Sequence, residues 1–304
     1  MKPDLPLRQI LHSKRANIYY LERVRILVRG GKIEYLTQEG GYWNIPLANT
    51  TFLLLGNGAS ITQAASRMLA KAAVPFGFCA GGGTPLYAAV DVLWVTPQSE
   101  YGPTKYMQQW MRMWLDPDQR LVAAKDLQRA RIQNTKKWWS STHFQKQGFN
   151  PGSLSSLVED LEDNLEDSTS NAALLGYEGA ATKKLYRKAA KATNHGSFQR
   201  KQQGTGVVNQ FLTHGNYLAY GCGAVVCWAL GIPPSLSVLH GKTRRGGLVY
   251  DFADIIKDGV ILPQAFISAQ IGHTRSEFKG ACIRSLMDLG ALDTMFKTAQ
   301  GLIS

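Results

Sequence analysis

The pattern of apolar residues changes character once along the 304 residues, close to residue 98. Before this point, short apolar runs alternate with glycine-containing turns, which is typical of β-strands. After Pro103 the apolar spacing becomes that of amphipathic helices. We therefore expect an α+β chain, with a β-rich N-terminal domain over 1–98 and an all-helical C-terminal domain over 99–304.

The N-terminal domain should contain a β-hairpin over 16–37, because Gly30 and Gly31 form a turn between two apolar runs. Strands are expected at 18–21, 24–28, 32–36, 51–55, 74–79 and 88–95. One helix should interrupt these strands, with Ser60 as its N-cap and its end near Lys71.

The C-terminal domain should consist of helices joined by short loops. They are expected over 106–115, 117–139, 157–167, 174–193, 207–230 and 251–268, with two further short helices at the end. Pro117 suits the first turn of the second of these helices. The most apolar window, 217–232, is too short for a membrane span and contains Gly221 and Gly223. It predicts a buried helix, and no membrane association is expected.

The charge balance points to a polyanionic partner. The chain carries a net charge of +12, which favours binding to nucleic acid or to an anionic membrane surface. The charge is uneven, since 159–167 is acidic and 183–201 is basic.

The cysteines favour a reducing compartment. They are Cys79, Cys222, Cys227 and Cys282. None forms a C-x-x-C pair, so buried free thiols are expected and a structural zinc site is not. The first residues contain no apolar run, so we expect no signal peptide and a cytoplasmic protein.

The stretch 240–258 combines a histidine, a basic loop and two aspartates. Asp251 and Asp254 are three residues apart and would share one face of a helix. An imidazole and carboxylates can together hold a divalent metal, so His240 joins the candidate ligands. The basic loop residues, which could bind phosphates, are Lys242, Arg244 and Arg245. Metal ligands beside phosphate-binding cations indicate phosphodiester chemistry.

Ordinary structural roles are also open for this stretch. Asp251 could be a helix N-cap, and His240 could be a hydrogen-bonded core histidine. The basic loop could be a solvated turn. Gly241, Lys242 and Thr243 resemble the end of a nucleotide-binding P-loop, but Leu236 stands where that motif requires glycine. A nucleoside triphosphatase is therefore not expected.

The helix expected over 174–193 contains Glu178 near its start and a basic stripe after it. The stripe consists of Lys184, Arg187, Lys188 and Lys191. A first-turn glutamate and a solvated basic face are the structural alternatives. Together with the basic chain, the stripe favours DNA binding. A site made of Glu178, His240 and Asp254 would suit Mg²⁺ or Mn²⁺ better than Zn²⁺.

The order of these motifs resembles a known family. A glutamate in a helix, a helix with Asn209 and Tyr217, a His-Gly pair and two aspartates three apart are similar to the CRISPR-associated spacer-acquisition integrases. These are the first of the two universal Cas adaptation proteins. The segments 12–21, 43–46 and 239–248 are most similar to the type I-F subtype.

The resemblance implies a role for each candidate residue. It places the metal ligands at Glu178, His240 and Asp254. Asp251 would also belong to the catalytic group, as a ligand, as a residue that orients a ligand, or as a helix cap.

The resemblance also implies a fold, partners and a reaction. Family members combine a β-rich domain, through which they form homodimers, with a helical domain. They join a second Cas adaptation protein, which in type I-F is fused to the Cas helicase-nuclease. The assembly binds double-stranded DNA, both the incoming spacer duplex and the CRISPR repeat. A 3′-hydroxyl of the spacer attacks a phosphodiester at the repeat end. A general metal-dependent nuclease acting on branched repair intermediates, and a DNA-binding scaffold without nuclease activity, remain alternatives.

Overall fold

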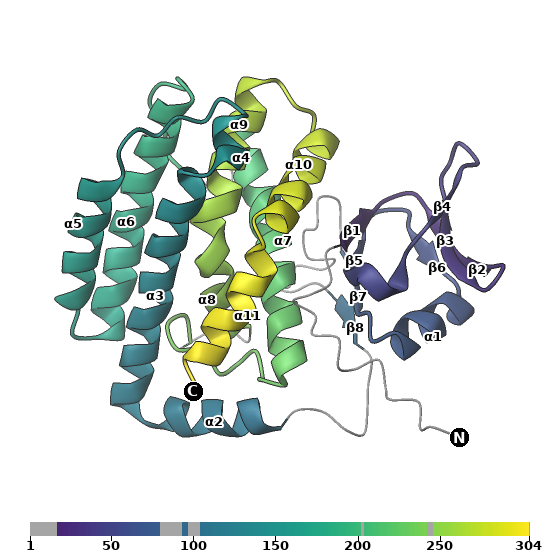
Figure 1. Cartoon of the computed structure of the whole chain (residues 1–304), viewed down its shortest axis with the longest axis horizontal. Helices are drawn as coiled ribbons and strands as arrows, with labels where there is room; N and C mark the ends of the chain where they lie inside the picture. The colour runs from purple at the N-terminus through teal and green to yellow at the C-terminus, as the bar shows by residue number, and fades with distance from the viewer. Residues whose placement is uncertain (1–16, 80–92, 97–103, 202–203, 242–245, 304) are drawn as a thin grey trace. The chain divides into compact units, whose positions relative to one another are not determined.

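The chain forms two compact units, Met1–Gly102 and Pro103–Ser304, and each is described by itself. The computed structural model describes residues 17–79, 93–96, 104–201, 204–241 and 246–303 (Figure 1). All described strands lie in the first unit, and the second unit is helical throughout its described secondary structure. The predicted α+β class is therefore confirmed.

The first unit contains two four-stranded sheets among its described residues. Its strands are β1 (Asn17–Leu21), β2 (Arg25–Arg29), β3 (Lys32–Leu36), β4 (Tyr42–Asn44), β5 (Thr50–Leu55), β6 (Ser60–Ile61), β7 (Phe76–Phe78) and β8 (Leu93–Val95). The sheet orders are β1-β5-β7-β8 and β4-β3-β2-β6. β2 and β3 form the expected hairpin, with positive φ at Gly30 and Gly31. β1, expected in the same hairpin, instead pairs in parallel with β5, with Ile18 opposite Phe52.

The helix of the first unit begins two residues later than expected. α1 (Gln63–Lys71) starts after Thr62, whose side chain accepts a hydrogen bond from the Ala65 N–H at 3.3 Å. The prediction of Ser60 as the N-cap is wrong, because Ser60 pairs with Arg25 in a sheet. α1 packs on an apolar core that includes Ile26, Ile33, Leu53, Leu55 and Leu69.

The second unit is a bundle of helices around α7 and α8. Its elements are α2 (Lys105–Leu115), α3 (Pro117–Trp139), α4 (Thr142–Gln145), α5 (Ser155–Glu166), α6 (Asn171–Ala192), α7 (Val207–Leu230), α8 (Gly247–Ile256), the π-helical turn η5 (Lys257–Ile261), α9 (Leu262–Gln270), α10 (Arg275–Asp288) and α11 (Ala291–Gly301). α3 begins as predicted, with Pro117 at its first position and Asp116 accepting hydrogen bonds from the N–H groups of residues 118 and 119. α7 is largely buried, as its apolar sequence predicted.

Close backbone contact fixes the packing of α7 on α8. A Cβ atom added to Gly223 would lie 2.6 Å from the Val249 carbonyl oxygen, so no larger residue fits without displacing backbone. The single helix expected over 251–268 is in fact three elements, α8, η5 and α9. At η5, a Cβ on Gly259 would lie 2.3 Å from the ring of Trp138 in α3. The π turn therefore requires a glycine at the point where it contacts α3.

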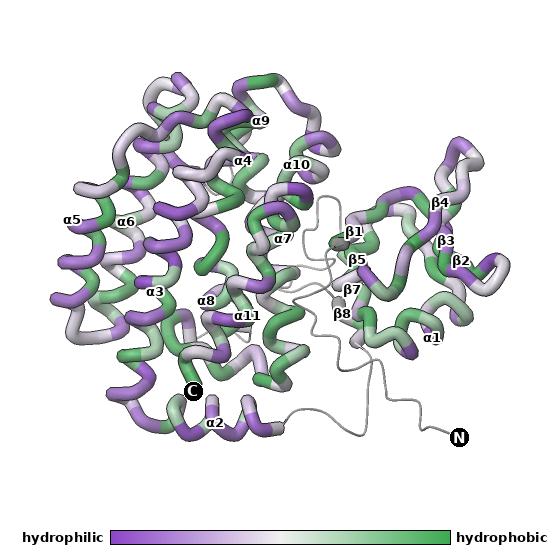
Figure 2. Tube along the Cα trace, viewed as in Figure 1, coloured by the Kyte–Doolittle hydropathy of each residue, from purple (hydrophilic) through white to green (hydrophobic). Residues whose placement is uncertain are grey.

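The acidic helix α5 lies beside α3 and α6 (Figure 1). Its hydrophilic and hydrophobic residues alternate along the helix (Figure 2), and its apolar residues Val158, Leu161 and Leu165 are buried. Its acidic residues form ion pairs with both neighbours, Glu166 with Arg129 and Asp160 with Lys184. The expected short solvated helix is thus solvated on one side only.

Two expectations from the sequence concern the cysteines and the apolar helices. All four cysteines are buried and form no disulfide, as predicted. None of the helices in the described part of the chain combines the length and the apolar character that a membrane span requires.

Candidate metal centre

Three candidate ligands from separate parts of the helical unit converge. Glu178 lies on α6, His240 in the turn before α8, and Asp254 on α8. One ligand atom from each lies within 4.8 Å of the others. His240 Nε2 is 3.2 Å from Glu178 Oε2 and 3.9 Å from Asp254 Oδ2. The arrangement brings two carboxylates and one imidazole around a common point.

Glu178 is held inside the bundle and does not serve as a first-turn residue. α6 begins at Asn171 after the N-cap Ser170, so Glu178 lies about two turns into the helix. Its side chain is 17% exposed. The alternative that helix-dipole stabilisation explains this glutamate is therefore wrong.

Asp251 orients His240. Its carboxylate accepts hydrogen bonds from the N–H groups of Val238 at 2.7 Å, Leu239 at 3.2 Å and His240 at 3.1 Å. The same carboxylate lies 2.7 Å from His240 Nδ1. α8 begins at Gly247, so Asp251 is not its N-cap. These bonds fix the turn that carries His240 and leave its Nε2 facing Glu178 and Asp254.

Asp254 is the most deeply buried of the three candidate ligands. It is 2% exposed, and its Oδ2 accepts no hydrogen bond from the described residues. It forms an ion pair with Lys257, one helical turn further on. Burial raises the pKa of Asp254 above its ordinary value. A buried carboxylate oxygen that accepts no hydrogen bond, beside an imidazole and a second carboxylate, fits the oxygen-rich coordination of Mg²⁺ or Mn²⁺.

Neighbouring charges set the protonation of the other two ligands. Although burial would raise the pKa of Glu178, the hydrogen bond with His240 and the charges of Arg131 and Lys257 lower it to about 2. Burial would lower the pKa of His240, but its bonds to Asp251 and Glu178 raise it to about 10. Without metal, His240 is therefore a cation between carboxylates, and a divalent ion would replace its proton.

The predicted DNA-binding residues on α6 do not all face the same way. Lys184 pairs with Asp160 of α5, and Lys188 donates a hydrogen bond to the Ser153 carbonyl at 2.9 Å. Arg187 and Lys191 are exposed. Three further predicted residues lie outside the described residues: Lys242, Arg244 and Arg245.

A groove of about 600 Å³ lies beside Glu178, between α6, α7 and the segment 198–200. Only one of the cations that line it, Arg187, was predicted from the sequence; the others are Arg131, Lys183, Arg200 and Lys257. Tyr186 and Phe198 add aromatic surface. Lys257 could have been found from its spacing, because it is three residues after Asp254. Lys183 and Arg200 carry no signal that distinguishes them from other basic residues.

Comparison with known proteins identifies the family. A family model described as "CRISPR associated protein Cas1" matches residues 19–268. A CRISPR-associated endonuclease Cas1 of Pseudomonas aeruginosa (strain UCBPP-PA14) is 52% identical over 96% of this chain and 94% of that protein. One of Pectobacterium atrosepticum is 48% identical over 98% of this chain and 95% of that protein. The chain belongs to the Cas1 family and is an endonuclease of it, so the resemblance stated from the sequence is confirmed.

Solved structures of low sequence identity share the fold. A TtCas1–DNA complex has a TM-score of 0.68 at 19% identity, covering 94% of this chain and 91% of that one. A casposase bound to an integration product has a TM-score of 0.66 at 18% identity, covering 86% and 75%. The matching chain of a Cas6-RT-Cas1–Cas2 complex has a TM-score of 0.65 at 14% identity, covering 94% of this chain and 34% of that one.

Proposed function

We propose that the chain is a Mg²⁺- or Mn²⁺-dependent DNA integrase and endonuclease that inserts short foreign DNA into a CRISPR array. The observation that carries this proposal is the convergence of Glu178, His240 and the buried Asp254 beside a cationic groove. The family supports the proposal, as does the casposase of similar fold that was solved with an integration product. In the reaction, a spacer 3′-hydroxyl attacks a repeat-end phosphodiester, one P–O bond forms, and the bond to the repeat strand breaks.

Glu178, His240 and Asp254 would hold the metal ion, and each has a defined task. A bound divalent ion would supply Lewis-acid stabilisation of the negative charge that develops on the phosphate. Asp251 keeps the proton of His240 on Nδ1, so that Nε2 is the ligand atom. Lys257 offers a second positive charge next to Asp254. Asp251 thus acts on the ligand and is not a ligand itself.

The DNA path proposed here follows the groove and not the whole basic stripe. Lys183 and Arg187 are exposed and line the groove. Lys184 and Lys188 are half-buried, with Lys184 bonded to α5 and Lys188 to Ser153 in the segment before it. The predicted stripe therefore separates into one face toward DNA and one face toward protein. We expect phosphate contacts in the groove to be salt-dependent and independent of base sequence.

Two adjacent pairs of cations on α6 provide a matched test of this path. Replacing Lys183 and Arg187 with alanine should lower the slope of log Kd against log salt by about 0.7 to 0.9 per cation, since each phosphate contact releases counterions. Replacing Lys184 and Lys188 removes the same charge but should leave the slope within error. Equal slopes for the two double variants would show that the groove is not the DNA path.

Partners are proposed from the family. A complex of similar fold contains Cas2, which supports a second Cas adaptation protein as partner of this chain. A DNA complex of similar fold supports double-stranded DNA as the substrate. Homodimerisation through the β-rich unit, and fusion of the second adaptation protein to the Cas helicase-nuclease, stay predictions from the resemblance.

Strand transfer tests the function directly. A labelled short duplex is incubated with a supercoiled CRISPR-repeat plasmid and Mn²⁺ or Mg²⁺, with and without the partner. Joined product that requires metal and is lost in His240→Ala, but kept in the control His143→Ala, is the expected result. His143 contacts Ser285 and Asp288 and none of the candidate ligands. Nicking without joining in the presence of a competent partner would instead favour the repair nuclease.

A further inference from the structure

A buried arginine lies directly behind Glu178. Arg131 is on α3, and its side chain is 3% exposed. Its guanidinium donates to Asp258 Oδ2 at 2.6 Å, to Thr182 Oγ1 at 2.6 Å and to Gln128 Oε1 at 3.0 Å. Nη1 also lies 3.5 Å from Glu178 Oε1. All three nitrogens of the group are therefore engaged, and one of them faces a candidate metal ligand.

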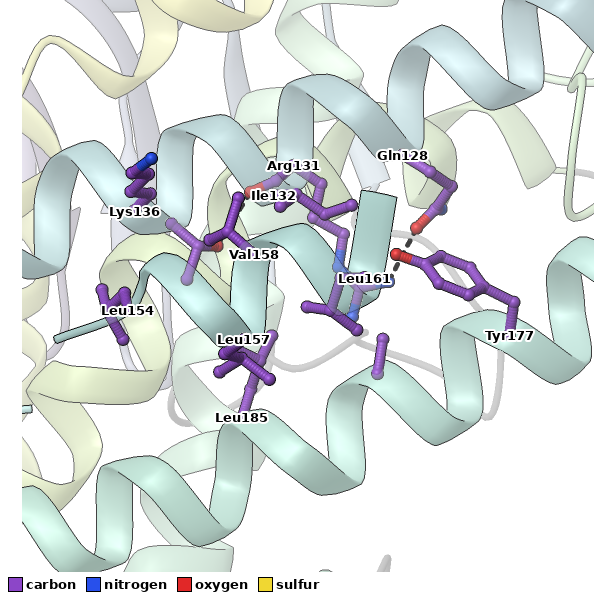
Figure 3. Close-up of a pocket in the computed structure, with 12 residues that line it drawn as sticks. Gln128, Arg131, Ile132, Lys136, Leu154, Leu157, Val158, Leu161, Tyr177 and Leu185 are labelled. Atoms are coloured by element: carbon purple, nitrogen blue, oxygen red, sulfur yellow. Dashed lines mark hydrogen bonds between the residues drawn. The ribbon is translucent and has the colours of Figure 1, made fainter. Parts of the chain in front are cut away.

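Arg131 lines the groove beside Glu178, but its side chain is 3% exposed and its nitrogens are held by protein partners, so it has little to offer DNA. On the side toward α5, it borders a cavity of only about 10 Å³ lined mainly by apolar side chains such as Val158, Leu161 and Leu185 (Figure 3). Figure 3 also shows its hydrogen bond to Gln128 on the same helix. A cation buried in this way requires a compensating negative charge, and Asp258 and Glu178 provide it.

The π turn η5 places Asp258 opposite Arg131. The turn adds a residue relative to regular α-helix, and such turns occur frequently at functional sites. It is built to fit α3, because Gly259 lies against Trp138 and Trp139 Nε1 donates to the Asp258 carbonyl at 2.8 Å. As a result, Lys257 faces Asp254 while the next residue, Asp258, faces Arg131.

The two oxygens of Glu178 have different neighbours. Oε1 faces Arg131 Nη1, whereas Oε2 faces His240 Nε2 at 3.2 Å. The Thr182 hydroxyl accepts a hydrogen bond from Arg131 and donates one to the Glu178 carbonyl at 2.8 Å. Arg131 is therefore also linked to the backbone of the helical turn that carries Glu178. We propose that Arg131, held by Asp258, is a positioning residue that directs a single oxygen of Glu178 toward the metal. This inference rests on the proposed metal site.

A purely structural ion pair would make a different prediction. Buried ion pairs can often be replaced by apolar residues of similar volume without loss of stability, whereas removal of one partner is damaging. The double variant Arg131→Met/Asp258→Leu removes both charges together, and it should retain a cooperative urea transition. If the pair only stabilises the fold, metal binding should survive in this variant. If the pair positions Glu178, metal binding should weaken although the fold persists.

Mn²⁺ binding measured by electron paramagnetic resonance on the full chain decides between these outcomes. We expect the double variant to bind Mn²⁺ about 10- to 100-fold more weakly than the wild type, as is typical when a residue that orients a metal ligand is lost. In metal-dependent cleavage, kcat should fall while KM for DNA stays unchanged, because Arg131 lines the groove with only 3% of its side chain exposed and with its nitrogens already engaged. Arg129→Met is the control, because Arg129 is an exposed cation of α3 that pairs with Glu166 of α5. This variant should change neither Kd nor kcat.

A second variant covers the case in which the double variant does not fold. Arg131→Lys keeps the charge opposite Asp258 but lacks the planar fork that engages three partners at once. It should fold and still bind Mn²⁺ at least several-fold more weakly. A folded variant of either kind that binds Mn²⁺ within twofold of the wild type would overturn the inference. Failure of the wild type itself to bind Mn²⁺ would instead overturn the proposed metal site.

Discussion

Asp251 and Asp254 lie on one helix three residues apart, yet their replacement by asparagine should differ in effect: stability suffers more at Asp251 and metal binding more at Asp254. Asp251 accepts four N–H groups, two on each oxygen. Asparagine offers one oxygen, so in either orientation of its amide two donors face an NH₂ group. Each buried donor left without an acceptor costs about 1–3 kcal/mol, and Asp251→Asn should therefore lose about 2–6 kcal/mol of unfolding free energy.

Asp254→Asn should cost less stability than Asp251→Asn. It weakens the pairing with Lys257, but no backbone N–H group loses an acceptor. Burial raises the pKa of Asp254, which means that its ionised form is disfavoured in the folded state at neutral pH. Removing this charge relieves that cost and offsets part of the lost ion pair, since Lys257 keeps the charge of Glu178 nearby. Mn²⁺ binding, in contrast, should be abolished in Asp254→Asn.

Urea unfolding at pH 7.5 in the presence of a chelator measures both effects, because the chelator removes any contribution of bound metal. Mn²⁺ titration of the same variants gives the second readout, with Asp251→Asn expected to bind about 10- to 100-fold more weakly. The reasoning is refuted if Asp251→Asn is as stable as the wild type. It is equally refuted if Asp254→Asn loses as much stability as Asp251→Asn.

Three further outcomes are expected. Burial lowers the pKa of His143 below 6.5, so the folded state loses stability as the pH falls below 6.5. Between pH 7.5 and 5.5, the unfolding free energy of His143→Gln should therefore fall less than that of the wild type. Hydrogen bonds raise the pKa of His240 to about 10 despite its burial, so Mn²⁺ binding at pH 7.5 should release about one proton. Calorimetry in two buffers of different ionisation enthalpy measures this release. No release would contradict the protonated state of His240. Gly223→Ala should lower the unfolding free energy by about 1–3 kcal/mol, because its Cβ would meet the Val249 carbonyl. Gly176→Ala, with open space around it, should raise the unfolding free energy by about 0.5–1 kcal/mol, and urea unfolding measures both.

Helices with local end signals were predictable from the sequence. Pro117 and the preceding aspartate set the start of α3, and Gly206 and Gly231, which flank a mainly apolar stretch, set both ends of α7. These signals act between residues that are close in the chain. The extra residue of η5 was not predictable, because its cause is the fit of Gly259 against a tryptophan of another helix.

Pairing between distant segments was also beyond sequence patterns. β1 was placed in a hairpin because the next strand follows closely, but its partner is β5. The basic stripe on α6 looked uniform, yet Asp160 of α5 neutralises one side of it. In both cases the sequence shows which residues are apolar or charged, but the partner is chosen by the packing of remote elements.

The residues of the candidate site were predicted from motif order and resemblance, and the geometry indicates what each residue does. The pattern singled out Glu178, His240 and Asp254, whose ligand atoms now lie within 4.8 Å of each other. It left three roles open for Asp251, and only the bonds to the turn before α8 distinguish them. Arg131 could not have been found, because nothing in the sequence connects it to Glu178.

The distribution of the ligands over α6, the turn before α8 and α8 has a consequence for how the activity appears during folding. Contacts between segments far apart in a chain form late, after the loop-closure entropy between them has been overcome. A partly synthesised or partly unfolded chain therefore has the separate carboxylates but no metal site. If the proposed site is the reaction centre, assembly from distant segments confines the reaction to molecules whose helical unit is complete.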